Sequence, residues 1–87
     1  MSIVLKALAD PTRRRIFELL RARPLTTGEI AAHFTLAKPT LSGHFVVLRE
    51  ADLVDADKQG TAITYRLKLS VLEEAIAELF RAAQGNE

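Results

Sequence analysis

The chain has 87 residues, of which 48% are hydrophobic, no cysteine, and a net charge of +1. This length accommodates one small domain, and the lack of cysteine excludes disulfides, thiolate metal sites and cysteine nucleophiles. No apolar run reaches the roughly 20 residues that span a bilayer, and the first residues have no signal-peptide layout. We therefore expect a single domain over residues 1–87 in a soluble, cytoplasmic protein without membrane insertion.

Charge is distributed unevenly along the chain. Residues 1–49 contain eight Lys or Arg and three Asp or Glu, a net charge of +5. Residues 50–87 contain four Lys or Arg and eight Asp or Glu, a net charge of −4. For any single arginine among residues 13–15, Arg21 and Arg23, a solvated helix face is the favoured interpretation. The basic half becomes informative because it also contains the motif described below.

Two helices are expected before residue 24. The first, about residues 2–9, is apolar on nearly every side, which is unusual for a surface helix. Asp10 and Pro11 then mark a new start, because Asp is a good N-cap and Pro fits the first turn. This second helix should run to about Ala22 and end at Arg23-Pro24. Its buried stripe should consist of Ile16, Phe17, Leu19 and Leu20.

Residues 26–54 predict two further helices joined by a tight turn. Thr26 and Glu29 have the spacing of a capping box, and the first helix has an apolar stripe of Ile30, Ala31 and Phe34. In the second helix, about residues 38–50, one face is apolar. That face carries Leu41, Phe45 and Leu48. A short helix with one face anchored and the other free suits a DNA groove, and the pair has the signature of a helix-turn-helix motif.

The expected turn at Thr35-Leu36 is chemically unusual. A tight turn between helices often needs a residue with positive φ, which β-branched Thr disfavours. Either the connection has another geometry or it is strained.

The periodicity changes after Asp52. Residues 53–57 and 61–67 have extended character, and Lys58-Gln59-Gly60 supplies the glycine of a hairpin connection. Along the second strand, Ile63, Tyr65 and Leu67 alternate with Ala62, Thr64 and Arg66. We expect an antiparallel hairpin over about 53–67 that packs against the helices, because a hairpin alone is marginally stable.

The last helix is predicted over about residues 70–84, with Ser70 and Glu73 as a second capping box. The apolar residues of the first and last helices exceed what a small core requires, which favours a homodimer with twofold symmetry. The predicted interface comprises Ile3, Val4, Leu5, Leu8, Leu72, Ile76, Leu79 and Phe80.

The chain resembles the ArsR family of winged helix-turn-helix transcriptional repressors over nearly its whole length. The resemblance is carried by the order of its elements, by ALADPTRRRI, LTTGEIAAHF and KPTLSGHFVVLREADLV, and by the QG of the hairpin. It implies a mainly α fold with a β-hairpin wing, in the order α-α-α-α-β-β-α, and a homodimer joined through the first and last helices. It also implies a recognition helix in the major groove, a wing near the DNA backbone or minor groove, and a palindromic double-stranded DNA operator.

Within the family, the chain is most similar to the metal-independent SdpR-type autorepressors, because it is short, has a long apolar last helix and lacks cysteine. This similarity implies autorepression, with release of DNA when a membrane protein partner sequesters the repressor.

Carried over by position, the DNA-facing candidates lie on the recognition helix, the wing and the second helix. They are Lys38, Thr40, Ser42, Gly43, His44 and Val46, then Lys58, Gln59 and Thr61, and Arg14. Gly43, Val46 and Thr61 depart from the family pattern, which usually has polar or basic residues there. Gly43 also costs about 1 kcal/mol in a helix relative to Ala, and Ala37 replaces an N-capping Ser. We therefore expect a locally weak recognition helix that relies on phosphate contacts and DNA shape.

Other classes of function find less support. The two histidines, His33 and His44, lie in different helices, and the glutamates of the last helix have no histidine beside them, so we expect no metal and no cofactor. The sequence has no phosphate loop and no nucleophile beside a base, which argues against an enzyme. A small-molecule inducer has no support beyond apolar helices that the core and the dimer explain.

The serious alternative is a winged-helix protein-interaction module with weakened DNA binding. Gly43, Val46, Asp55 and Asp57 would suit it. We favour divergence toward a different operator, because the basic half still surrounds the motif.

Overall fold

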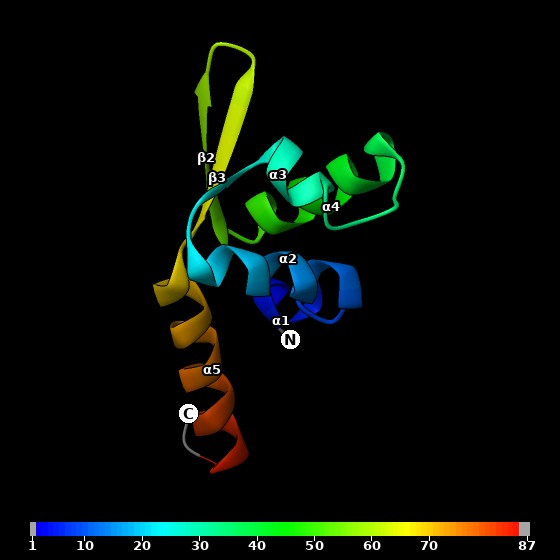
Figure 1. Cartoon of the computed structure of the whole chain (residues 1–87). Coiled ribbons are helices and arrows are strands. Elements are labelled where there is room, and N and C mark those ends of the chain that lie inside the picture. The colour runs from blue at the N-terminus through cyan, green and yellow to red at the C-terminus, as the bar shows by residue number, and fades with distance from the viewer. Residues whose placement is uncertain (1, 86–87) are drawn as a thin grey trace.

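The structure, a computed structural model, describes residues 2–85 (Figure 1). Its elements are α1 (Ile3–Ala7), α2 (Pro11–Ala22), β1 (Leu25–Thr26), α3 (Thr27–Ala31), α4 (Lys38–Glu50), β2 (Val54–Gln59), β3 (Ala62–Leu67) and α5 (Leu69–Ala83). Helices α1 to α4 form the body, the β2–β3 hairpin projects from one end and α5 extends from the other (Figure 1). The molecule is accordingly elongated, with extents of 47 × 23 × 20 Å. The predicted mainly α fold with a hairpin wing is confirmed.

The predicted start of α2 is confirmed in detail. Asp10 Oδ2 accepts a hydrogen bond from the Arg13 backbone N–H at 3.0 Å, and Pro11 occupies the first turn. Helix α1 is shorter than predicted and ends at Ala7. Its chain then turns through Leu8 and Ala9, whose N–H groups bond back to the end of the helix.

The connection between α3 and α4 spans six residues, 32–37. It begins as a turn, in which His33 N–H bonds to Ile30 O and Phe34 N–H bonds to Ala31 O, so the prediction of a tight turn at Thr35-Leu36 is wrong. No residue of this segment has positive φ, so the connection has another geometry and does not place β-branched Thr35 in the left-handed region. The capping box at the start of α3 is confirmed, because Thr26 Oγ1 accepts from Glu29 N and Glu29 Oε1 accepts from Thr26 N.

Helix α4 ends in a Schellman motif that the sequence did not reveal. Asp52 has a φ of 61°, its N–H bonds to Arg49 O, and the N–H of Leu53 bonds to Leu48 O. Leu48 and Leu53 are both fully buried, which provides the apolar contact that usually accompanies this motif. The motif turns the chain sharply from α4 into β2.

The sheet has three antiparallel strands in the order β1-β3-β2. The two-residue strand β1 was not predicted; Leu25 pairs with Tyr65 and Thr26 with Thr64. The hairpin connection is also shorter than predicted, because Lys58 and Gln59 are paired within β2 and only Gly60 and Thr61 remain in the turn. The φ of +62° at Gly60 suits a tight hairpin turn that begins with glycine.

The predicted capping box at Ser70 is wrong. The backbone N–H of Lys68 bonds to Leu53 O at 2.8 Å, so the pairing between the two hairpin strands continues one residue beyond β3. Helix α5 begins immediately afterwards at Leu69. Ser70 therefore lies inside the first turn, and Lys68 at the cap position makes no side-chain capping bond.

The core lies between the α1–α4 body and the base of the sheet. Its fully buried side chains are Ile16, Ile30, Leu48 and Leu53. Helix α5 contributes one buried residue, Ala75, so most of this helix lies outside the core. No helix within residues 2–85 is long and apolar enough to cross a bilayer.

Candidate nucleic-acid interface

Helix α4 occupies the range predicted for the recognition helix, and its two faces differ as expected. Leu41, Phe45 and Leu48 are buried, whereas Lys38, Thr40, Ser42, Gly43 and Val46 are exposed. The start of the helix has no side-chain cap, because Ala37 stands at the N-cap position. The anchored face thus holds the helix while the opposite face remains accessible to a partner.

Arg49 extends this outer face and was missed by the sequence analysis. It is exposed and follows Ser42 by seven residues, so it lies on the same side of α4 as Ser42 and Val46. The spacing i, i+4, i+7 would have identified it. Arg49 adds a cation next to the apolar Val46.

The wing is oriented relative to α4 by an aromatic pair. The rings of Tyr65 in β3 and Phe45 in α4 stack with centroids 4.5 Å apart and an interplanar angle of 12°. Both side chains are buried, and Ile63 and Leu67 lie partly buried on the same face of β3 as Tyr65. The predicted alternation along β3 is confirmed, and the stack sets where the wing stands beside the recognition helix.

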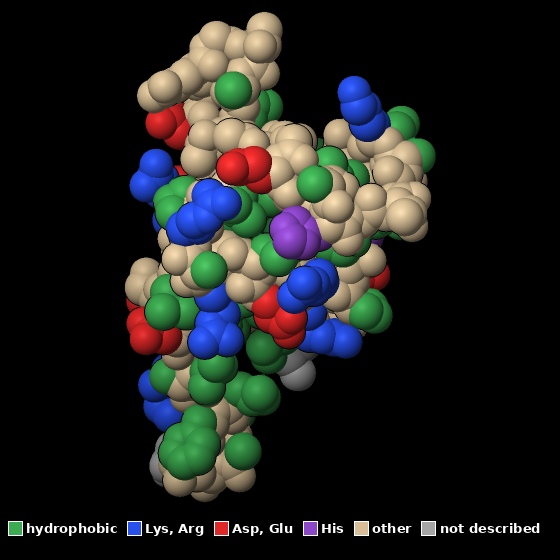
Figure 2. Space-filling model, in the orientation of Figure 1, with side chains coloured by type: hydrophobic (Ala, Val, Ile, Leu, Met, Phe, Trp, Pro, Cys, Tyr) green, Lys and Arg blue, Asp and Glu red, His purple; other side chains and the backbone are tan. Residues whose placement is uncertain are grey.

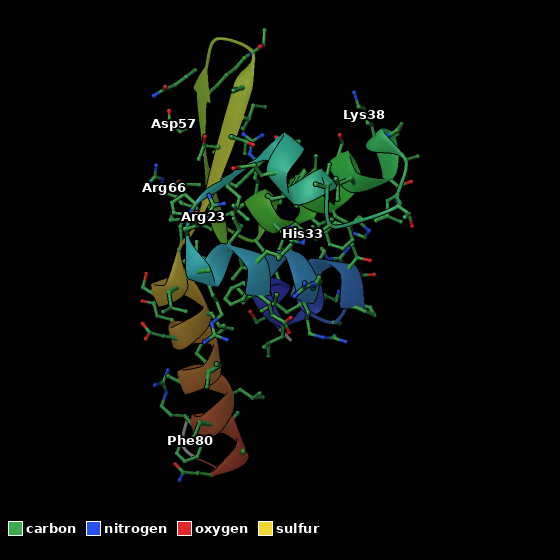
Figure 3. The ribbon with its side chains drawn as sticks, viewed as in Figure 1. Arg23, His33, Lys38, Asp57, Arg66 and Phe80 are labelled. Carbon is green, nitrogen blue, oxygen red and sulfur yellow. The ribbon has the colours of Figure 1, made fainter. Side chains whose placement is uncertain are left out.

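The wing tip and the start of α4 project toward the same side of the molecule. Lys38 points outward from the first turn of α4, on the side toward which the hairpin extends (Figure 3). Lys58, Gln59 and Thr61 at the wing tip are all exposed. Asp55 and Asp57, nearer the base of β2, are exposed as well and place negative charge beside these residues.

His44 does not belong to the outer face. Its side chain is 16% exposed, and its Nδ1 atom lies 3.1 Å from Arg13 Nη1 and 3.8 Å from Asp10 Oδ2. The backbone hydrogen bond from Arg13 is the main reason why the pKa of Asp10 lies below its usual value; the nearby His44 and Arg13 charges also lower this pKa, while burial opposes the shift. The structure therefore places His44 against α2 rather than toward a groove.

Arg14 also departs from its expected role. Its Nη1 atom donates to Leu8 O and Ala9 O, both at 2.9 Å, so the guanidinium holds the connection between α1 and α2. Arg15 lies 3.6 Å from Glu18 in an exposed pair. The 13–15 segment is thus engaged mainly within the body.

The predicted dimer residues divide into two groups. Val4 is buried, and Leu8 and Leu72 pack partly buried against the core, so these three stabilise the protomer itself. Others remain exposed: Ile3 by 57%, Ile76 by 52%, Leu79 by 44% and Phe80 by 63%. Figure 2 shows hydrophobic side chains gathered on α5, far from the wing. A groove of about 260 Å³ runs between α1 and α5, where Leu5 and Leu79 line it with Ala75.

A metal site has no support in the described residues. Within residues 2–85, no three His, Asp or Glu side chains gather closely enough to hold an ion. His33 is exposed and lies on the face shown in Figure 3, whereas His44 is engaged with Arg13.

Comparison with known proteins identifies the fold and the family. A family model described as a helix-turn-helix domain matches residues 8–56. The transcriptional repressor SdpR of Bacillus subtilis is 41% identical over 76 residues, which cover 87% of this chain and 84% of that protein. The biofilm growth-associated repressor of Agrobacterium fabrum is 37% identical over 89 residues, which cover 99% of this chain and 76% of that protein.

Among solved structures, an ArsR family transcriptional regulator matches with a TM-score of 0.87 and 29% identity, and the match covers 94% of this chain and 90% of that one. The family model thus matches more than half of the chain, and both named repressors are similar over most of its length. The chain therefore belongs to the ArsR family of winged helix-turn-helix transcriptional repressors.

Proposed function

We propose that this protein is a single-domain repressor that binds a palindromic DNA operator as a homodimer, with α4 in the major groove and the wing on the backbone. The observation that carries the proposal is the division of α4 into a buried face and an exposed face beside a wing that projects to the same side. A B-DNA major groove admits a helix presented in this way.

The outer face of α4 offers few groups for base readout. Thr40 and Ser42 can donate or accept hydrogen bonds at base edges, and Val46 can contact a thymine methyl group. Lys38, Arg49 and Lys58 are exposed cations suited to phosphates. Binding should therefore depend steeply on salt, with part of the selectivity supplied by DNA shape.

Dimerisation would bring two recognition helices onto one operator. The exposed apolar side chains of α1 and α5 support a twofold contact, because monomeric proteins rarely leave such a patch uncovered. In our proposal the contact uses Ile3, Leu5, Ile76, Leu79 and Phe80.

We infer a binding role rather than a catalytic one, since the named relatives are transcriptional repressors. Repression of transcription would be exercised on DNA in the cytoplasm and requires no cofactor. We extend the proposal to autorepression, with a protein partner that sequesters the repressor as the releasing signal, because the short cysteine-free chain with its long last helix resembles the SdpR-type autorepressors.

Selection of bound sequences from random duplexes with the purified protein tests this function. We expect a palindromic consensus with half-sites about one helical turn, roughly 34 Å, apart. Enrichment of a single unrepeated half-site would contradict the dimeric mode of binding.

The alternative is a protein-interaction module, and the exposed acids Asp55 and Asp57 on the wing favour it. Failure to enrich any sequence, together with no binding of any duplex at low salt, would select this alternative and exclude our proposal.

A further inference from the structure

A polar junction joins three helices of the body at the inner side of α4. Arg13, in the first turn of α2, donates from Nε to Ala7 O at 2.6 Å, at the end of α1. Its Nη1 atom lies 3.1 Å from Nδ1 of His44 in α4. The carboxylate of Asp10, which caps α2, lies 3.8 Å from the same Nδ1. One guanidinium therefore spans from α1 to the recognition helix.

The Arg13–His44 contact is a hydrogen bond in only one protonation state of His44. A guanidinium only donates, so Nδ1 can accept this bond only when the imidazole is neutral with its proton on Nε2. A protonated imidazole has two N–H donors and no acceptor, which would place two cations against each other. Asp10 is the group toward which a protonated His44 would then be drawn.

The junction supplies a directional contact to a part of α4 that otherwise lacks one. The start of α4 has no side-chain cap, and Leu41 and Phe45 anchor it through apolar contacts, which have no preferred direction. A hydrogen bond from Arg13 to His44 restricts how the helix can rotate or slide on α2. Because Arg13 also holds the end of α1, the orientation of α4 is tied to a helix of the proposed dimer surface.

We propose that Arg13 and His44, with Asp10, are positioning residues that hold the recognition helix in its DNA-binding orientation. This inference rests on the proposed DNA binding. Its consequence is that acidification, which protonates histidine between about pH 8 and pH 5, weakens operator binding. The charged groups facing His44 are Asp10 and Arg13; α1 adds the exposed Lys6, and the acids and Lys58 of β2 are exposed on the wing.

The test measures operator affinity by fluorescence anisotropy near pH 7.5 and near pH 5.8 for wild type and variants. His44→Asn keeps an acceptor close to the position of Nδ1 but cannot titrate, whereas His44→Leu removes the acceptor. His33→Leu is the matched control, because His33 is exposed on α3's C-terminal side and lies outside the junction. Thermal unfolding of each variant verifies that it is folded.

Near pH 7.5, we expect His44→Leu to weaken operator binding about tenfold, because it loses one hydrogen bond to a charged group. We expect His44→Asn to change the affinity by less than about threefold, because it retains an acceptor for this bond. Acidification should weaken wild type about threefold to tenfold and leave His44→Asn unchanged. His33→Leu should behave like wild type at both pH values. A purely structural role for His44 would not make the pH dependence disappear in the Asn variant.

The opposite pH profile would overturn the inference. If wild-type affinity rises on acidification and His44→Asn weakens binding, His44 contacts DNA phosphate instead. Unchanged affinity in folded His44→Leu would also exclude the positioning role.

A double-mutant cycle with Arg13→Ala and His44→Leu tests the junction without DNA, through the unfolding equilibrium constant of each variant. If the effect of one substitution on this constant changes more than about threefold when the other is present, the two side chains interact and the junction is supported. Independent, additive effects on the free energy of unfolding would contradict it. Loss of DNA binding by every protein, wild type included, would instead contradict the proposed function.

Discussion

Gly43 weakens the recognition helix without serving its packing. It is exposed within α4, and a Cβ atom at this position would meet nothing within 4 Å. Gly43→Ala should therefore stabilise the protein by about 1 kcal/mol, because alanine loses less backbone entropy in a helix. Urea unfolding measures this gain. No gain, or a loss, would indicate that α4 is not helical at this position.

Asp10 makes the stability of α2 dependent on pH. Because the Arg13 N–H bond keeps the pKa of Asp10 below its usual value, the ionised carboxylate stabilises the folded state above about pH 3.8, and this contribution is lost as pH falls through the lowered pKa. Asp10→Ala should cost about 1 kcal/mol near pH 7, as for other N-caps. The difference from wild type should shrink below about pH 3.8.

Unfolding curves at several pH values measure this effect, with Asp57→Ala as the control, because Asp57 is exposed on the wing. An Asp10→Ala deficit that stays constant down to about pH 2.5 would show that the carboxylate charge does not contribute.

At the scale of the elements, local capping chemistry predicted the starts of α2 and α3. Asp10-Pro11 and Thr26 with Glu29 each satisfy backbone N–H groups nearby in sequence, so their signal is contained in a few residues. The period of Leu41, Phe45 and Leu48 likewise predicted a helix here and identified its buried face.

The failures concern features that depend on distant partners. Strand β1 exists because Leu25 pairs with Tyr65, forty residues later in the chain. The start of α5 is set by the bond from Lys68 to Leu53, which overrides the local capping signal of Ser70. The inward rotation of His44 follows from Arg13 on another helix. Sequence spacing alone placed Ser42, Gly43 and Val46 correctly on the exposed side of α4, but it could not reveal these tertiary contacts.

The left-handed residue that ends α4 gives a further prediction. Asp52 has positive φ, and its carboxylate bonds Lys68 Nζ at 2.7 Å, which raises the pKa of Lys68. Asp52→Gly and Asp52→Val both remove that ion pair, but only valine is strained at this φ. The Val variant should therefore be about 1–2 kcal/mol less stable than the Gly variant.

Chemical denaturation of the two Asp52 variants gives this difference directly. Equal stability of the Gly and Val proteins would mean that the Schellman turn after Glu50 is absent.

At the scale of the whole molecule, the two ends of the protein differ in character. The wing and the start of α4 lie toward one end, and the exposed apolar side chains of α5 lie toward the other, where Phe80 is located (Figure 3). This separation lets one surface hold a second protomer while the other contacts DNA.

Leu79→Asp should disrupt the dimer, because it places a charge in the apolar groove beside Leu5. The matched control is Ala77→Asp, which adds the same charge on the polar side of α5 next to Glu73 and Arg81. Sedimentation should show a dimer for wild type and Ala77→Asp, and a monomer or unfolded chain for Leu79→Asp. A wild-type protein that is monomeric at micromolar concentration would exclude this dimer.

The central claim is that α4 and the wing bind operator DNA, and affinity measured across salt concentrations tests it most directly. Lys58→Ala removes an exposed wing cation, Ser42→Ala removes a hydroxyl from the outer face of α4, and Arg81→Ala removes a cation from α5 as a control. We predict that Lys58→Ala weakens operator and unrelated duplexes alike and reduces the salt slope by about 1. Ser42→Ala should mainly reduce the preference for the operator, and Arg81→Ala should change neither quantity. An unchanged affinity and salt slope for Lys58→Ala, combined with loss of all binding for Ser42→Ala, would contradict this account.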